Sequence, residues 1–199
     1  MYLLGLRIAE LRGTLPPERL AELVAEMKAL PSKMEETLAA TEGPAREVAD
    51  RHSDQNFFLY LGRHIGLPVC LEGALKLKEI SYIPTDAYAA GEMKHGPIAL
   101  LDESTPVICV ATAGPILEKV LSNVEEVRAR GAQTIGIATA GDPRVAEVTE
   151  ETIEVAASDW ILQPILAILP LQLLAYDIAR KRGLNVDQPR NLAKTVTVE

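Results

Sequence analysis

Val107-Ile-Cys-Val-Ala111 and Thr134-Ile-Gly-Ile-Ala138 are two short apolar runs on either side of the stretch from Ile116 to about Arg130. Each run has the length and the β-branched content of a buried strand. The stretch between them has the length of a helix, and Gly131 stands where helices commonly end in a left-handed residue. A strand, a helix and a second strand in this order predict two parallel strands joined by a crossover helix.

The same alternation extends in both directions along the chain. Before this unit, Phe57-Phe-Leu-Tyr-Leu61 is another apolar run, and a helix is predicted over Cys70–Ser81. After it, Thr152–Val155 predicts a fourth strand, and Leu162–Arg182 predicts a helix that Pro170 kinks or splits. We therefore expect an α/β fold, with a parallel sheet covered by helices on both faces as a three-layer sandwich.

The first fifty residues contain only helical patterns. Apolar residues at helical spacing predict a helix over residues 2–12, closed by Gly13. Three further helices are predicted: one opened by Pro16-Pro17, one capped by Ser32, and one over about 45–52 that Gly43-Pro44 separates from the rest. We interpret residues 1–50 as a helical arm that precedes the sandwich.

The composition argues against several classes of function. The 199 residues carry a formal net charge of −8 and no Lys/Arg-rich run, which disfavours nucleic acid or an acidic membrane surface as a partner. The most apolar stretch, Trp160–Ala175, is too short and too mixed to span a bilayer. Cys70 and Cys109 lie in apolar surroundings, as reduced core cysteines do. We expect a soluble cytoplasmic protein.

Ligands of open parallel sheets bind beyond the carboxyl ends of the strands, so the loops after the strands matter most. The first such loop, Gly62-Arg-His-Ile-Gly66, lacks the three closely spaced glycines of a dinucleotide fingerprint and the hydroxyls of a phosphate cradle. The loop Ala111-Thr-Ala-Gly-Pro115 offers one hydroxyl, from Thr112, and Pro115 lacks a backbone donor. These loops do not support a nucleotide site.

Three charged residues share one face of the helix predicted over 70–81. Glu72, Lys76 and Glu79 have the spacing at which helical side chains pair, and the simplest interpretation is a surface salt-bridge ladder. The alternative is catalytic: since this helix follows the first strand, one of its ends is expected at the ligand-binding crevice. A carboxylate beside an ammonium can move a proton between carbons next to a carbonyl.

Two further residues are candidates for chemistry. His95 lies in a glycine-rich turn beside charged neighbours, whereas His52 and His64 are expected to be structural. Lys194 lies in the polar C-terminal segment, in a stretch that we expect to be extended. A lysine in a crevice can form a Schiff base with the carbonyl of an open-chain sugar.

These segments together closely resemble the C-terminal isomerase half of the glutamine:fructose-6-phosphate amidotransferase (glucosamine-6-phosphate synthase) family. The resemblance covers the whole α/β part and is carried by Leu71-Glu-Gly-Ala-Leu-Lys-Leu-Lys-Glu-Ile-Ser-Tyr-Ile83, Ala87-Tyr-Ala-Ala-Gly-Glu-Met-Lys-His-Gly-Pro97, Val124–Gly131, Pro170–Tyr176 and Val186–Glu199. It implies a sugar isomerase (SIS) domain with a flavodoxin-like fold.

The resemblance also implies roles for single residues. Lys194 would form the Schiff base with open-chain fructose 6-phosphate, Glu79 would move a proton between C1 and C2, and His95 would assist ring opening across a homodimer. Lys76 would lie near the reacting hydroxyls, and we assign Ala193, next to Lys194, to substrate binding as well. The family uses no metal and no organic cofactor. Ammonia from glutamine then replaces the bound lysine, which gives glucosamine 6-phosphate.

By the same resemblance, residues 1–50 would end a first SIS domain, 51–186 would form the second, and 187–199 would be a catalytic tail. The family's phosphate-gripping Ser/Thr loops belong to its first SIS domain, and its glutaminase domain is a separate partner. We therefore expect a C-terminal fragment that folds but does not turn over alone. The alternative is a non-catalytic SIS module that senses a hexose phosphate or only dimerises. A related sugar-phosphate isomerase or deaminase would still need the missing phosphate loops.

Overall fold

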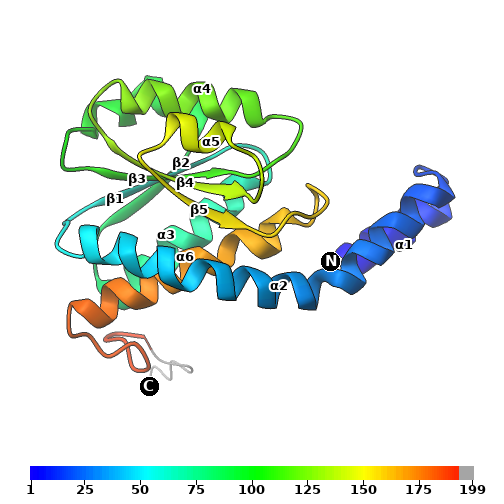
Figure 1. Cartoon of the computed structure of the whole chain (residues 1–199), viewed down its shortest axis with the longest axis horizontal. Coiled ribbons are helices and arrows are strands. Elements are labelled where there is room, and N and C mark those ends of the chain that lie inside the picture. The colour runs from blue at the N-terminus through cyan, green and yellow to red at the C-terminus, as the bar shows by residue number, and fades with distance from the viewer. Residues whose placement is uncertain (193–199) are drawn as a thin grey trace, which may run out of the picture.

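The apolar runs form a five-stranded parallel sheet in the computed structural model, which describes residues 1–192 (Figure 1). The strands are β1 (Phe58–Gly62), β2 (Thr85–Ala89), β3 (Pro106–Ala111), β4 (Gln133–Thr139) and β5 (Glu151–Val155), in the order β2-β1-β3-β4-β5. All residues of β1 and β3 are buried, as expected for parallel strands covered on both faces. The neighbouring pairs Tyr60–Ile108 and Ile108–Ile135 fix the register of the central strands.

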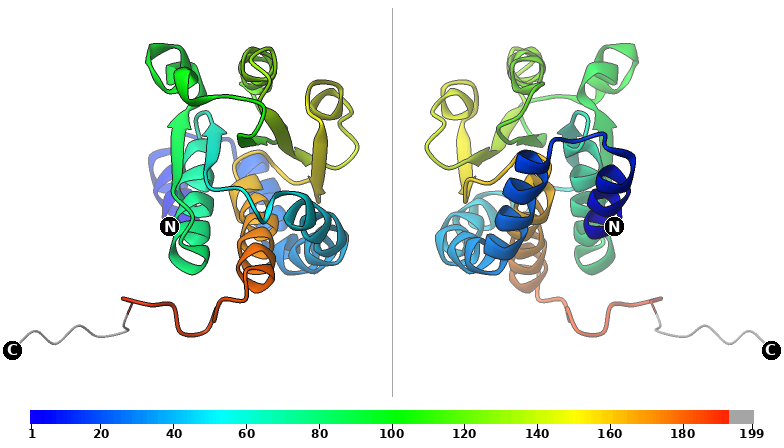
Figure 2. Two further views of the ribbon diagram at one scale, coloured as in Figure 1. Left: turned by 90° about the vertical axis from the view of Figure 1, so that its left-hand side faces the viewer. Right: turned by 90° about the vertical axis from the view of Figure 1, so that its right-hand side faces the viewer.

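Helices cover both faces of this sheet (Figures 1 and 2). One face is covered by α2 (Pro17–His52), α3 (Gly66–Ser81) and α6 (Gln163–Lys181). The other face is covered by α4 (Leu117–Arg128), α5 (Arg144–Val148) and the 3-10 turn η1 (Ala90–His95), which continues into η2 (Pro97–Leu100). The strands contribute alternate side chains to the two layers: Phe58 and Tyr60 pack on the first, and Leu59 and Leu61 on the second. The predicted α/β sandwich is confirmed.

The N-terminal segment consists of α1 (Tyr2–Arg12) and one continuous α2 rather than four helices. Gly13, with φ 60°, closes α1 as predicted. The predicted breaks at Ser32 and at Gly43-Pro44 are wrong, because Pro31 and Pro44 both lie inside α2. Gly43 has no Cβ to clash with the ring of Pro44, which lets the helix pass that point.

Burial on one side of α2 explains why the helix continues through its prolines. From Leu30 onward, the buried residues of α2 recur at helical spacing and pack over α6 and β5: Leu30, Thr37, Thr41, Ala45, Val48, Ala49 and His52. Thr37 also accepts the buried N–H of Ala156 at 3.1 Å. Tertiary packing of this stripe outweighs the loss of one backbone hydrogen bond at each proline. The division of the chain near residue 50 stays a prediction.

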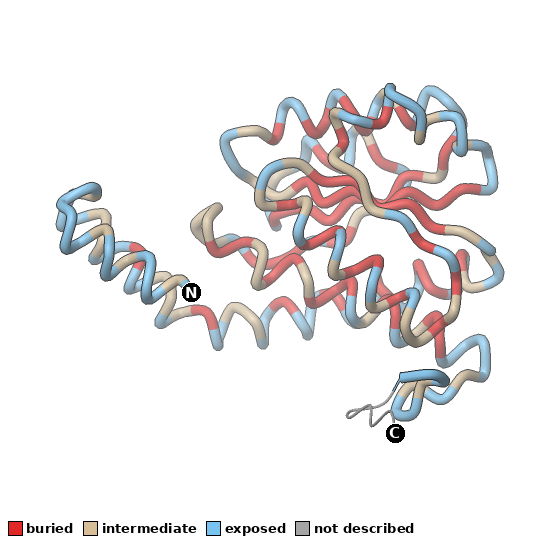
Figure 3. The backbone as a smooth tube through the Cα atoms, turned by 180° about the vertical axis from the view of Figure 1, so that it is seen from behind, coloured by how far each residue is buried: buried red, intermediate tan, exposed pale blue. Residues whose placement is uncertain are grey.

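By contrast, α1 has no buried residue (Figure 3). Polar contacts join the α1–α2 end of the molecule to the segment before α6. Tyr2 Oη donates to the carbonyl of Ile161 at 2.8 Å, and Glu26 accepts from Ser158 Oγ at 2.8 Å. Arg19 pairs with Asp159 in the same region.

Two further elements differ from the sequence prediction. The sequence did not predict the strand β2, because Thr85-Asp-Ala-Tyr-Ala89 has no apolar run. Among residues 1–192, β2 is an edge strand that pairs only with β1. Pro170 does not split the last helix, since α6 runs through it and the proline is itself buried.

Candidate functional site

The charged face of α3 forms as predicted. Lys76 Nζ lies 2.7 Å from Glu79 Oε2 and 3.7 Å from Glu72 Oε1, so the ammonium lies between two carboxylates. The hydrogen bond to Glu79 is the largest cause that raises the pKa of Lys76 above its ordinary value. The side chains of Lys76 and Glu79 are 34% and 29% exposed, so the pair is open to a ligand as well as to water.

One end of α3 lies at the carboxyl edge of the sheet, as expected, and Glu79 lies near the other end of the helix. α3 begins at Gly66, directly after the carboxyl end of β1, and runs back along the sheet. Glu79 lies about 20 Å further along the helix, at 1.5 Å per residue. The end of α3 at the carboxyl edge is therefore the Gly66 end, and Glu79 lies near the amino edge instead.

His95 lies on the other side of the sheet. It ends η1, whose Ala90 and Met93 are buried with the α4 layer, and Lys94 beside it pairs with Glu126 of α4 at 2.8 Å. The His95 side chain is exposed. One chain thus presents Glu79 and Lys76 on one face and His95 on the opposite face, and does not bring them together.

The C-terminal candidates Ala193 and Lys194 lie outside the described residues. The segment just before them is described. It leaves α6, passes beneath the end of α3 in Figure 2, and the backbone N–H of Arg190 donates to Tyr82 Oη at 2.8 Å. Tyr82 directly follows α3, so this contact joins the tail to the same end of α3 that carries Glu79.

The usual ligand position of this fold, where the order of the strands reverses between β1 and β3, is almost filled. The cavity there has a volume of about 20 Å³, which is room for a single water molecule and too little for a hexose phosphate. The His64 and Trp160 rings line it with their centroids 5.6 Å apart and their planes tilted by 40°, and Arg63 Nη1 donates to Asn123 Oδ1 at 3.0 Å.

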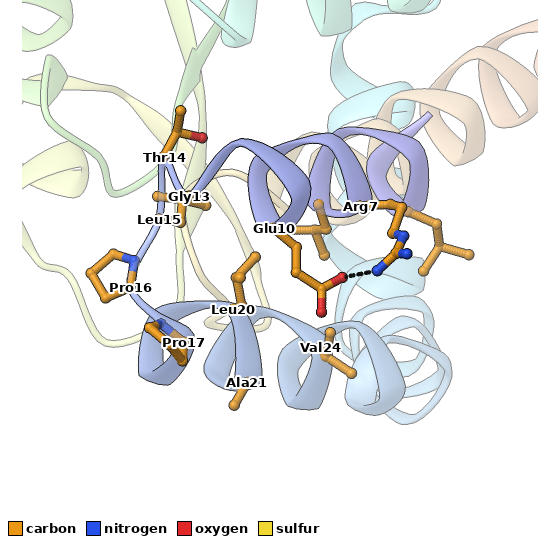
Figure 4. A pocket seen from close by; sticks show the side chains of 12 residues that line it. Arg7, Glu10, Gly13, Thr14, Leu15, Pro16, Pro17, Leu20, Ala21 and Val24 are labelled. Carbon is orange, nitrogen blue, oxygen red and sulfur yellow. Dashed lines mark hydrogen bonds and ion pairs between the residues drawn. The ribbon is translucent and has the colours of Figure 1, made fainter.

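The larger hollow of about 980 Å³ lies between α1 and the start of α2 (Figure 4). It is lined mainly by aliphatic side chains, with the Arg7–Glu10 pair at 2.6 Å on its rim. None of Lys76, Glu79 and His95 lines it. The hollow is the open angle between two helices and has no arrangement of polar groups for catalysis.

The other titratable candidates are structural. His52 Nε2 lies 2.6 Å from Glu151 Oε1, as expected for a structural histidine. Cys70 and Cys109 are free and fully buried, and burial raises the pKa of both thiols, that of Cys109 to about 12. Within residues 1–192, no group of three or more His, Cys, Asp or Glu side chains could hold a metal ion. No helix in this range is long and apolar enough to cross a membrane.

Two residues of this region were missed in the sequence. Tyr82 and Arg190 form the contact between α3 and the tail, and the guanidinium carbon of Arg190 lies 4.1 Å from the centre of the Tyr82 ring. They are distant in sequence, so no spacing pattern joins them. The local signal was a tyrosine in place of the usual glycine after a helix.

Curated proteins that align with the whole chain are about 50% identical to it in sequence. Glutamine–fructose-6-phosphate aminotransferase [isomerizing] from Gloeobacter violaceus is 50% identical over 198 residues, covering 100% of this chain and 32% of that protein. The protein of the same name from a strain of Thermus thermophilus is 52% identical over 199 residues, covering 100% and 33%. The chain therefore spans about a third of the length of these relatives.

Solved structures give the same picture, and they confirm the resemblance expected from the sequence. The C-terminal domain of glucosamine-fructose-6-phosphate aminotransferase from Francisella tularensis superposes with a TM-score of 0.87 and 35% identity, covering 94% of this chain and 52% of that one. A glucosamine-6-phosphate deaminase from Thermotoga maritima gives a TM-score of 0.66 and 28% identity, covering 96% and 53%. The family model described as "SIS domain" matches residues 53–181, which is more than half of the sequence, and the chain therefore belongs to the SIS domain family.

Proposed function

We propose that this chain is the C-terminal isomerase part of a glutamine–fructose-6-phosphate aminotransferase, which converts fructose 6-phosphate to glucosamine 6-phosphate with ammonia from glutamine. The observation that carries the proposal is the alignment of the whole chain, at 50% and 52% identity, with two proteins of that name. The Lys76–Glu79 pair on an accessible helix face and the filled cavity between β1 and β3 support it. They suit a domain that supplies reacting groups while another domain holds the phosphate.

The proposed reaction starts with the amine of Lys194, which adds to the C2 carbonyl of the open-chain sugar and releases water to form an imine. Ammonia then adds to C2 of this imine and expels the lysine amine, which leaves an imine of ammonia on C2. Glu79 removes a proton from C1 and returns it to C2 while the C1 hydroxyl proton passes to nitrogen, which gives an amine on C2 and a carbonyl at C1. Lys76, at 2.7 Å from Glu79, holds that carboxylate in place and is close enough to contact the sugar hydroxyls beside it. Ala193 would contact the substrate next to Lys194.

The proposed role of His95 in ring opening requires a second copy of the chain. Glu79 and His95 lie on opposite faces of one sheet, so a histidine that acts on the same sugar as Glu79 has to come from a partner subunit. We therefore propose a homodimer, and we place it in the cytoplasm because a charged phosphosugar does not cross a bilayer unaided. The glutaminase and first SIS domains are the proposed covalent partners.

The test is reductive trapping in the complete protein. Borohydride should fix fructose 6-phosphate covalently to the wild type and to Lys119→Ala, a control at an exposed lysine of α4, and not to Lys194→Ala. Trapping that persists in Lys194→Ala removes this lysine from its role. The 199-residue chain alone should show negligible isomerisation, and robust activity would contradict its proposed dependence on another domain.

Two other substitutions test the remaining roles. Glu79→Gln should lower isomerisation by a factor of about 10² to 10⁴, the range of a lost general base. No effect of Glu79→Gln would favour a non-catalytic SIS module that senses a hexose phosphate or only dimerises. Mixing inactive Glu79→Gln and His95→Ala subunits should restore part of the activity, because one site of the mixed dimer keeps both groups. Absence of any recovery contradicts the shared site.

A further inference from the structure

Tyr82 and Arg190 contact each other in two ways at once. The Tyr82 hydroxyl accepts the backbone N–H of Arg190 at 2.8 Å, and the Arg190 guanidinium carbon lies 4.1 Å from the centre of the Tyr82 ring. The hydrogen bond fixes the backbone of the tail, and the cation–π contact fixes its side chain over the same ring. We call this pair of contacts the Tyr82–Arg190 clasp.

The backbone of Tyr82 shows that the clasp is not an incidental surface contact. Tyr82 has φ 62° and ψ 14°, in the left-handed region that bulky side chains rarely adopt. Its N–H still caps α3 by donating to the carbonyl of Lys78 at 3.2 Å, a task that glycine performs with less strain. The contacts of the Tyr82 side chain explain why a tyrosine is kept in this strained conformation, since its hydroxyl and its ring both contact Arg190.

The path of the tail from α6 to the clasp is also defined by specific contacts. Gly183, with φ 70°, turns the chain at the end of α6. Asn185 Oδ1 then accepts the backbone N–H groups of Asp187 at 3.0 Å and Gln188 at 3.2 Å, which folds the segment into an Asx turn. These contacts direct the described tail beneath the end of α3 (Figure 2).

We propose that Tyr82 and Arg190 are positioning residues for the proposed reaction, because they hold the tail up to Leu192 against the end of α3 that carries Glu79. The proposal rests on the proposed function. Tyr82 follows Glu79 by about 5 Å along the helix axis. Lys194 follows Arg190 by four residues in the sequence. Two groups that act on adjacent sugar carbons have to be held in place relative to each other, because a misplacement of about 1 Å can cost two orders of magnitude in rate.

The chain offers a matched control for the clasp. On α6, Arg180 Nη1 donates to Tyr176 Oη at 2.9 Å and its guanidinium carbon lies 5.6 Å from the ring centre, so the same two side chains meet away from the tail. Tyr82→Ala removes both contacts of the clasp, and Tyr82→Phe removes the hydrogen bond but keeps the ring. Tyr176→Ala removes the control pair.

The experiment measures two quantities in the complete protein. Hydrogen exchange of the C-terminal peptide should become about tenfold faster in Tyr82→Ala, and partly so in Tyr82→Phe, while Tyr176→Ala leaves it unchanged. In a single turnover with fructose 6-phosphate, the rate at which the borohydride-trapped imine forms should fall about tenfold in Tyr82→Ala, without a change in KM. The same rate should not fall in Tyr176→Ala.

Two results would overturn the proposal. In the first, Tyr82→Ala exchanges hydrogen and traps sugar at the same rates as the wild type. In the second, the Tyr82 and Tyr176 variants change the exchange rate and the trapping rate equally. If Tyr82→Ala does not fold, Tyr82→Phe decides by the same two measurements. A wild-type protein that traps no sugar refutes the proposed function instead, and hydrogen exchange of the tail then still decides whether the clasp holds it.

Discussion

Gly73 lies where α3 crosses α6, one turn before Lys76, and its replacement by alanine tests the packing that fixes the charged face. A Cβ at this position would lie 2.6 Å from Leu171 Cδ1, 3.1 Å from Tyr60 Cε1 and 3.2 Å from Leu171 Cβ. Leu171 and Tyr60 are both fully buried, so neither has free space into which it can move. The two helices would have to separate.

The sign of the effect follows from two opposing terms. Alanine in place of a helical glycine stabilises by about 1 kcal/mol, whereas overpacking a filled core costs about 1–3 kcal/mol. A Cβ only 2.6 Å from a buried side chain puts the overpacking cost near the top of its range, so we expect Gly73→Ala to lower the free energy of unfolding by about 2 kcal/mol. For a chain of this size, that is a fall in Tm of about 4–8 °C.

The assay is thermal unfolding followed by circular dichroism, with Gly5→Ala as the control. Gly5 lies inside α1, and a Cβ there meets nothing within 4 Å, so this variant should be as stable as the wild type or slightly more so. An unchanged or higher Tm in Gly73→Ala would refute the steric argument. In the complete protein, Gly73→Ala should also slow isomerisation, because it displaces the helix that carries Glu79.

Three further predictions concern other parts of the chain. Hydrogen bonding to Lys33 lowers the pKa of Glu26 from 4.5 to about 2. At pH 7, Glu26→Gln should therefore lower the free energy of unfolding by about 1 kcal/mol, a value discounted because the Glu26 side chain is 34% exposed. Urea unfolding at several pH values should show this difference vanish as the pH falls from 4.5 to 2. Cys70 and Cys109 should not react with a thiol reagent until the chain unfolds, and fast reaction in the native state contradicts their burial. Thr37→Val keeps the shape but leaves a buried N–H unpaired, so it should destabilise by about 1–3 kcal/mol in urea unfolding, and a loss of only a few tenths would contradict this.

The sequence predicted the central strands well because their signal is local. Residues 107–111 and 134–138 are buried on both faces, and an apolar run is sufficient to identify such strands. The edge strand β2 pairs on one side only, and most of its residues are partly exposed, so its sequence carries no such run. The continuity of α2 depends on its burial against α6, which no local pattern at Pro31 or Pro44 records.

The candidate site was predictable in its residues but not in its arrangement. The spacing of Glu72, Lys76 and Glu79 is a helical property, and the pairing of the ammonium with both carboxylates follows from it. The separation of Glu79 from His95 depends on the route of the chain after β2, which passes to the α4 side of the sheet. The Tyr82–Arg190 clasp depends on the turn after α6. Both are set by tertiary structure.

The placement of Glu79 and His95 on opposite faces of one sheet has a kinetic consequence. Under the proposed function, a lone subunit holds two half-sites and no complete one, so catalysis becomes second order in protein once the dimer dissociates. The specific activity of the complete protein should then fall on dilution and recover on concentration, with a midpoint at the dissociation constant of the dimer. Subunit abundance itself would regulate the rate, without any effector.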